Sequence, residues 1–185
     1  TYIVQKFAKE HYENVVYMNF ILEPDKKSAF TGNIDVDTII LNLSALIPGS
    51  RFVNGKTCII LDEIQDCPEA ISAMKYFCEK TPEYAVACAG SLLGLAFGHQ
   101  GFSFPVGKVD HMNMYPVTFS EFLEQRDDRL YQYYMSMDSL EPLPDVFFDR
   151  LSQAFTAYRI SGGMPAVAMK MIEKDLNGVE TTLRN

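Results

Sequence analysis

The feature that most constrains this chain is a short apolar run that ends in two adjacent carboxylates. Residues 58–61 read Cys-Ile-Ile-Leu, and Asp62 and Glu63 follow directly. A short apolar run bounded by polar residues is typical of a strand buried in a parallel sheet. In open α/β sheets, ligands bind beyond the carboxyl ends of the strands. The pattern therefore predicts a strand over 57–62 that brings both carboxylates to a binding edge.

The Asp62–Glu63 doublet has two interpretations. As a Walker B motif, Asp62 would hold Mg²⁺ and Glu63 would aim a water molecule at a phosphate. Alternatively, the two carboxylates only end the strand and cap the next helix. The neighbouring segments favour the first interpretation.

Segments with strand and helix patterns alternate over residues 1–116 and predict an α/β fold, with a parallel sheet covered by helices on both faces. Asp37 is the expected cap of the second helix, and Thr118 or Ser120 the cap of a helix that follows the sheet. The predicted strands are 14–20, 57–62, 84–89 and 108–115, the helices among them are 1–12, 38–46 and 68–80, and 21–34 and 93–107 are loops.

No strand pattern is visible after Asp127. Helices are expected over 128–137 and 145–160, and another begins at Pro165 after a Ser-Gly-Gly break. The last ten residues are polar, and we expect them to fray. This helical remainder indicates a lid or a second small domain.

Composition limits the possible partners. The 185 residues are 48% hydrophobic and 22% charged, with a net charge of −8. No basic stripe supports binding of nucleic acid, and no run reaches the ~20 apolar residues of a membrane span. The first residues lack the pattern of a signal peptide, so we expect a soluble, cytoplasmic protein. The four cysteines form no C-x-x-C pair and are interpreted as reduced thiols rather than zinc ligands.

A Walker B motif is useful only beside a phosphate-binding loop. The one local match to its ending, Asn54-Gly55-Lys56-Thr57, leads into the strand 57–62 and not into a helix. The loop needs a helix amino end facing the phosphate, so this match has no mechanism. Thr1 is the better candidate, because it directly precedes an amphipathic helix. We expect the first strand and most of the phosphate loop to lie outside the 185 residues.

Several motifs together resemble the prokaryotic AAA+-type ATPases whose Walker B motif ends in DEIQ. In chain order they are the helix TYIVQKFAKEHY, the strand NVVYMNF, the run CIILDEIQDCPEA, the segments ACAGSLLG and FPVGKVDHMNMYPVTFSEFL, and GGMPAVAMK. The resemblance covers residues 1–173. It implies a P-loop ATPase sheet flanked by helices over 1–126 and a helical lid over 127–185, and family members usually carry a nuclease-like domain after this core.

The resemblance also implies roles for individual residues. Thr1 matches the last position of the Walker A loop and, with Asp62, would hold Mg²⁺ and the nucleotide. Glu63 matches the residue that orients the attacking water, and Ser91 matches the polar sensor of the γ-phosphate, although a helix cap explains Ser91 equally well. Lys108 stands where relatives often have arginine, and a surface lysine is the favoured interpretation. Candidates for an arginine that acts in trans are Arg126, Arg129, Arg150 and Arg159.

The expected cofactors are ATP and Mg²⁺, and the expected partners are an unknown protein client and further copies in a homo-oligomer. Because the glycine-rich loop and its lysine are not in this sequence, we expect these residues alone to be inactive. One alternative is an ATPase-like interaction module that does not hydrolyse ATP. Another is a different α/β domain, receiver-like or hydrolase-like, that uses Asp62 and Glu63 for a metal only.

Overall fold

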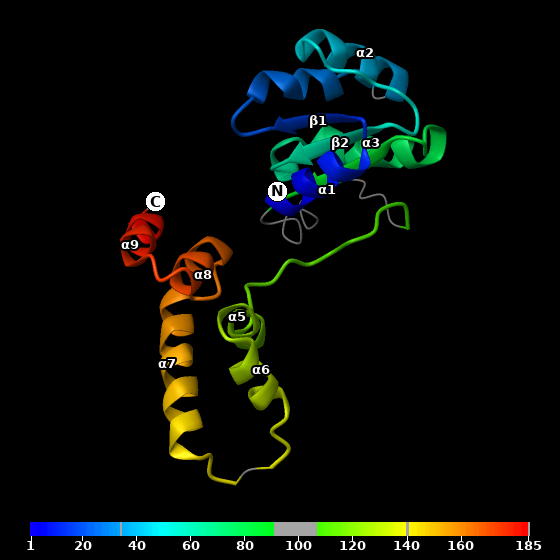
Figure 1. The fold of residues 1–185 in the computed structure, drawn as a ribbon. Helices are drawn as coiled ribbons and strands as arrows, with labels where there is room; N and C mark the ends of the chain where they lie inside the picture. The colour runs from blue at the N-terminus through cyan, green and yellow to red at the C-terminus, as the bar shows by residue number, and fades with distance from the viewer. Residues whose placement is uncertain (34, 91–106, 140, 185) are drawn as a thin grey trace. The chain divides into compact units, whose positions relative to one another are not determined.

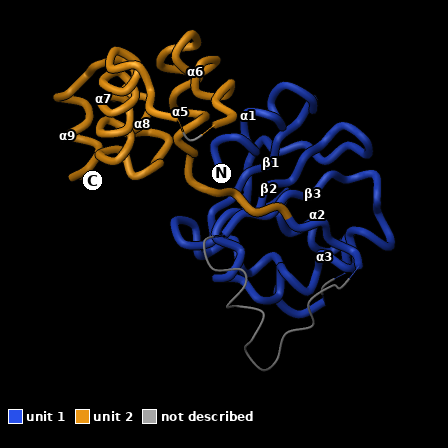
Figure 2. The backbone as a smooth tube through the Cα atoms, turned by 90° about the horizontal axis from the view of Figure 1, so that it is seen from below, with its two compact units in different colours: residues 1–111 blue, residues 112–185 orange. Residues whose placement is uncertain are grey.

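The structure is a computed structural model that describes residues 1–33, 35–90, 107–139 and 141–184. The chain divides into two compact units, residues 1–111 and 112–185, which Figure 2 shows in blue and orange. Buried hydrophobic clusters form separately within each unit. The boundary predicted at 126/127, between a nucleotide-binding core and a lid, stays a prediction.

A parallel three-stranded sheet forms the centre of the first unit. Its strands are β1 (Asn14–Asn19), β2 (Thr57–Asp62) and β3 (Ala85–Ala89), in the order β1-β2-β3. In the pairing register Asn19 lies opposite Asp62, and Asp62 lies opposite Ala89. The three strands therefore end together at one edge of the sheet, and the predicted α/β class is confirmed.

Helices cover both faces of this sheet (Figure 1). α1 (Tyr2–His11) packs on the face that carries Cys58 and Ile60. The opposite face carries Ile59 and Leu61, because successive side chains of a strand point to opposite sides. That face is covered by three elements: the 3₁₀ helix η1 (Pro24–Phe30), α2 (Val36–Leu46) and α3 (Pro68–Lys80).

The second unit is helical in the part of the chain that the structure describes. Its helices are α5 (Phe119–Arg126), α6 (Asp128–Met135), α7 (Asp145–Ser161), α8 (Pro165–Ile172) and α9 (Leu176–Arg184). Thr118 caps α5 in a capping box with Glu121. Gly162 and Gly163 both have positive φ at the break between α7 and α8, which fits glycine at a sharp turn.

The strand predicted over 108–115 is wrong. These residues form no helix or strand, and Met112 and Tyr115 are 85% and 77% exposed. A strand is stable only with a ladder partner, and among the described residues β3 pairs with β2 alone. The weak alternation of apolar residues in this segment therefore has no sheet to join.

Three smaller expectations are also corrected. Of the last ten residues, 176–184 form α9 rather than fraying, because Val179 is buried against α8 and Asp175 accepts the Gly178 N–H. Asp35 rather than Asp37 caps α2, since its side chain accepts two N–H groups of the first turn. The predicted loop 21–34 contains the 3₁₀ helix η1, whose first residue, Pro24, suits a helix start.

Candidate functional site

Asp62 is the centre of the candidate site. It is the last residue of β2, is only 4% exposed, and points to the face covered by α1. Its carboxylate accepts three hydrogen bonds, from Thr1 Oγ1 at 2.9 Å, Tyr17 Oη at 2.8 Å and Asn19 Nδ2 at 3.2 Å. A buried carboxylate is costly unless it is hydrogen-bonded, and these donors meet that requirement.

Thr1 joins the amino end of α1 to the carboxyl end of β2. It occupies the cap position of α1, but its hydroxyl makes no capping bond and donates instead to Asp62 Oδ1. The first turn of α1 contains no acidic residue. The positive end of the helix dipole and its free N–H groups therefore lie beside Asp62 without a competing carboxylate.

Glu63 has an unusual backbone conformation. Its φ is 52° and its ψ is 44°, in the left-handed region that non-glycine residues rarely adopt. The short 3₁₀ helix η2 (Ile64–Asp66) follows, and Gln65 Nε2 donates to Glu63 Oε2 at 2.6 Å. The turn places Glu63 at the end of the strand with a partly buried carboxylate.

The Asn54–Thr57 segment lies at the other end of β2. Thr57 is the first residue of that strand and is fully buried. Its hydroxyl accepts the Val53 N–H at 2.9 Å and donates to the Arg51 carbonyl at 3.1 Å. These bonds hold a turn before the strand. The segment leads into β2 and not into a helix, so it lacks the helix that a phosphate loop needs.

Comparison with protein families decides what kind of domain carries this site. A family model described as an AAA domain matches residues 1–123. The chain belongs to the AAA domain family. No curated protein matches the chain. No solved structure matches it either. Membership supports an AAA-type P-loop ATPase domain and, with it, nucleotide binding.

The residues of this AAA domain fit a magnesium ion bound together with a nucleotide. Among the described residues, no group of three or more His, Cys, Asp or Glu side chains could hold a metal by itself. Mg²⁺ needs no such group, because it is usually bound by one or two carboxylates, water and substrate phosphates. Asp62 and the Thr1 hydroxyl, 2.9 Å apart, provide one such partial set.

Ser91 lies outside the described residues. Lys108 forms an ion pair of 3.3 Å with Glu79 at a partly exposed position, which agrees with a surface lysine. Of the four candidate arginines, Arg150 pairs with Asp127, and Arg126 donates to the Met171 carbonyl at 3.4 Å.

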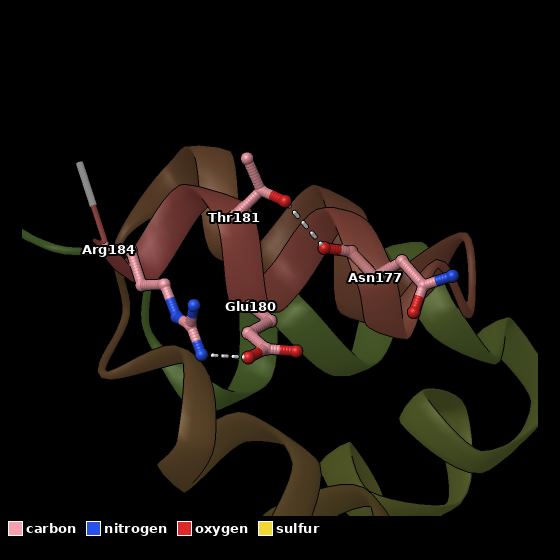
Figure 3. Close-up of a pocket in the computed structure, with 4 residues that line it drawn as sticks. All are labelled: Asn177, Glu180, Thr181 and Arg184. Atoms are coloured by element: carbon pink, nitrogen blue, oxygen red, sulfur yellow. Dashed lines mark hydrogen bonds and ion pairs between the residues drawn. The ribbon is translucent and has the colours of Figure 1, made fainter.

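A surface depression of about 450 Å³ lies along α9, and Asp62 is not among the residues that line it. It is lined by four exposed residues of α9, and Figure 3 shows the ion pair of Arg184 with Glu180 across it. Thr181 donates to the Asn177 backbone carbonyl at 3.0 Å, and none of the predicted site residues lines the depression. No helix among the described residues is long and apolar enough to span a bilayer.

Two residues that bond Asp62, Tyr17 and Asn19, were not predicted from the sequence. Burial, and then the hydrogen bond to Asp62, raise the pKa of the Tyr17 hydroxyl, which keeps it a donor at neutral pH. A signal was present, because after Asn14 the strand is otherwise apolar, and these two polar side chains, two residues apart, must share a face. Recognising it required the register that places Asn19 opposite Asp62.

Proposed function

We propose that this AAA domain is the core of an ATPase that transfers the γ-phosphoryl group of ATP to water with the help of Mg²⁺. The observation that carries the proposal is the hydrogen bond of 2.9 Å from Thr1 Oγ1 to Asp62 Oδ1. It brings the amino end of a helix and the acidic end of a buried strand to one place. Phosphate-binding sites of P-loop proteins need both elements.

Each residue has a role in this proposal. Thr1 and Asp62 hold the metal ion, which when bound neutralises charge on the phosphates. Glu63, in the left-handed backbone conformation directly after β2, orients the attacking water. Ser91, after β3, contacts the γ-phosphate or the water. Positioning and electrostatic stabilisation supply most of the rate gain in this type of reaction.

We also propose that the 185 residues bind ATP weakly or not at all when they are alone. Their sequence contains no G-x-x-x-x-G-K-[ST] loop, whose amides and lysine supply most phosphate contacts. Isothermal calorimetry on this chain tests the point, and micromolar ATP affinity would contradict it. The chemical energy would drive a conformational change on a protein client, within a homo-oligomer of the kind that AAA relatives form.

The function itself is tested by Glu63→Gln in a longer chain, the loop-bearing chain, in which a strand and a phosphate loop ending in Gly-Lys precede Thr1. We expect hydrolysis to fall by about 10²-fold or more, because removal of a group that orients the nucleophile has effects of that size. Nucleotide affinity should stay within about twofold, because the roles of Thr1 and Asp62 are untouched.

The matched control is Glu13→Gln, which makes the same chemical change at the opposite end of the sheet, where Glu13 pairs with Lys56. Its turnover should equal that of the unmodified protein. Unchanged hydrolysis by the Glu63→Gln protein would remove Glu63 from the mechanism. Hydrolysis lost equally in both variants would show a general effect of charge and not a role in catalysis.

A further inference from the structure

The two carboxylate oxygens of Asp62 accept different numbers of hydrogen bonds. Oδ2 accepts both the Tyr17 hydroxyl, at 2.8 Å, and the Asn19 side-chain amide, at 3.2 Å. From the described residues, Oδ1 accepts the Thr1 hydroxyl alone, at 2.9 Å. Each carboxylate oxygen offers about two lone pairs, so Oδ2 is saturated while Oδ1 keeps one free.

The orientation of the Asn19 amide is fixed by its other contacts. Its Oδ1 accepts the backbone N–H groups of Ile21 and Leu22, both at 3.0 Å. An amide oxygen accepts and an amide nitrogen only donates, so a flipped amide would lose both bonds and would face the Asp62 carboxylate with its oxygen. Asn19 can therefore serve Asp62 only as a donor.

A second layer of contacts holds Asn19 from behind. Its backbone N–H donates to Glu23 Oε2 at 3.2 Å, and the other oxygen of Glu23 pairs with Lys26. Lys26 lies in η1 and is only 9% exposed. The turn after β1 is thus tied to η1, and the donor that reaches Asp62 cannot move independently of it.

Tyr17 is held by packing. Its ring belongs to the apolar cluster between α1 and the sheet, together with Ala8 and Ile60. The ring lies two residues before Asn19 on the same face of β1, so its hydroxyl reaches diagonally to the end of β2. Only the hydroxyl touches the carboxylate, and the ring's apolar contacts do not depend on it.

We propose that Tyr17 and Asn19 are positioning residues that saturate Oδ2 of Asp62, so that Oδ1, beside the Thr1 hydroxyl, is the oxygen presented to a divalent cation. The inference rests on the proposed function, because it concerns the same carboxylate. Cis ligands of an octahedral Mg²⁺ ion at ~2.0–2.1 Å lie about 2.9 Å from one another. The Thr1 Oγ1–Asp62 Oδ1 separation of 2.9 Å already has that length, so the pair needs no rearrangement beyond turning the hydroxyl proton away.

The test uses Mn²⁺ together with ADP as the probe, in the loop-bearing chain described under the proposed function, because the ion is expected to bind with the nucleotide phosphates. Paramagnetic broadening of backbone amide NMR signals locates the ion, and the Mn²⁺ concentration at half-effect gives its affinity. Tyr17→Phe removes one hydroxyl and should raise that concentration about tenfold, the size expected for loss of a partner that orients a metal ligand. Tyr84→Phe is the matched control, because Tyr84 is a half-buried tyrosine packed on the other face of the sheet, just before β3.

Asn19→Ser gives a second, independent variant. A serine hydroxyl can still accept the N–H two residues later but cannot reach Asp62, so the turn is kept and the donor is lost. We expect weaker Mn²⁺ binding here too, by a smaller factor because the 3.2 Å bond is the longer of the two. Thermal unfolding in the presence of EDTA shows whether each variant is folded before metal binding is compared.

The outcomes separate this inference from the function on which it rests. Asp62→Asn should abolish the broadening around residues 1 and 62. If it does so while Tyr17→Phe and Asn19→Ser bind Mn²⁺ within twofold of the unmodified chain, the positioning role is wrong and the metal role of Asp62 stands. If broadening is absent there, or survives Asp62→Asn, the metal role itself fails and the inference falls with it.

Discussion

The two ends of β2 carry similar kinds of residue in different surroundings. At the amino end, Lys56 pairs with Glu13 at 2.8 Å, and the Thr57 hydroxyl bonds the backbone of the preceding turn. At the carboxyl end, Asp62 is surrounded by donors from α1 and β1. At the amino end, Gly55-Lys56-Thr57 cannot form a phosphate-binding loop, because no helix begins there.

Both ends also contain a residue in the left-handed region. At the amino end it is Gly55, with φ of 73°, and at the carboxyl end it is Glu63, with φ of 52°. Glycine adopts this conformation without a steric penalty, whereas a residue with a side chain loses about 1–2 kcal/mol. The backbone is therefore unstrained at Gly55, in the turn before β2, and strained at Glu63, where a carboxylate is proposed to act.

The largest expected effect is on ATP hydrolysis, which should depend on the carboxyl end of β2 and not on its amino end. In the loop-bearing chain, Asp62→Asn should reduce hydrolysis by about 10²–10³-fold, since a metal contributes several kcal/mol to stabilisation of the transition state. Steady-state phosphate release measures this. Thr57→Val, at the other end, should leave turnover per folded molecule within about twofold. A Thr57→Val protein that loses hydrolysis while folded would contradict the distinction.

The second effect is a loss of stability, and we expect it from the substitution at the amino end of β2. Thr57→Val keeps the shape of the side chain but leaves the Val53 N–H and the Arg51 carbonyl without their partner. We expect the free energy of unfolding to fall by about 1–3 kcal/mol. Urea unfolding followed by circular dichroism measures it. A change below about 0.5 kcal/mol would mean that these bonds do not hold the turn.

The sequence was sufficient for elements whose pattern is local. The strand 57–62 and the helix 68–80 have the bounds of β2 and α3, because an apolar run and a proline at the helix start define them. The strand predicted over 108–115 failed because a strand also needs a partner, which no local pattern reveals. Tyr17 and Asn19 were missed for a related reason, since their proximity to Asp62 depends on the pairing of β1 with β2.

The third effect comes from opposite substitutions at the two left-handed residues, glycine to alanine at one and glutamate to glycine at the other. Gly55→Ala should lower the free energy of unfolding by about 1–2 kcal/mol through the backbone alone, because a Cβ at Gly55 meets no atom within 4 Å. Glu63→Gly should raise it by about 0.5 kcal/mol, since relief of strain exceeds the extra entropy of glycine in the unfolded chain. Urea unfolding of both proteins provides the comparison.

Opposite signs would support strain at Glu63. Destabilisation by Glu63→Gly of more than about 1 kcal/mol would show that the Glu63 side chain, through Gln65, stabilises its own turn. The assignment of strain to a functional need would then be wrong.

The smallest expected effect belongs to Lys56→Ala. Its ammonium and the Glu13 carboxylate are both more than half exposed, at 53% and 66%, so water and salt screen the pair. We expect a loss of at most about 0.5 kcal/mol, and a smaller one in 0.5 M NaCl. ATP affinity of the loop-bearing chain should not change, because Lys56 lies at the opposite end of β2 from Asp62. A tenfold loss of ATP affinity would instead identify Lys56 as a phosphate ligand and would move the nucleotide site to the amino end of the sheet.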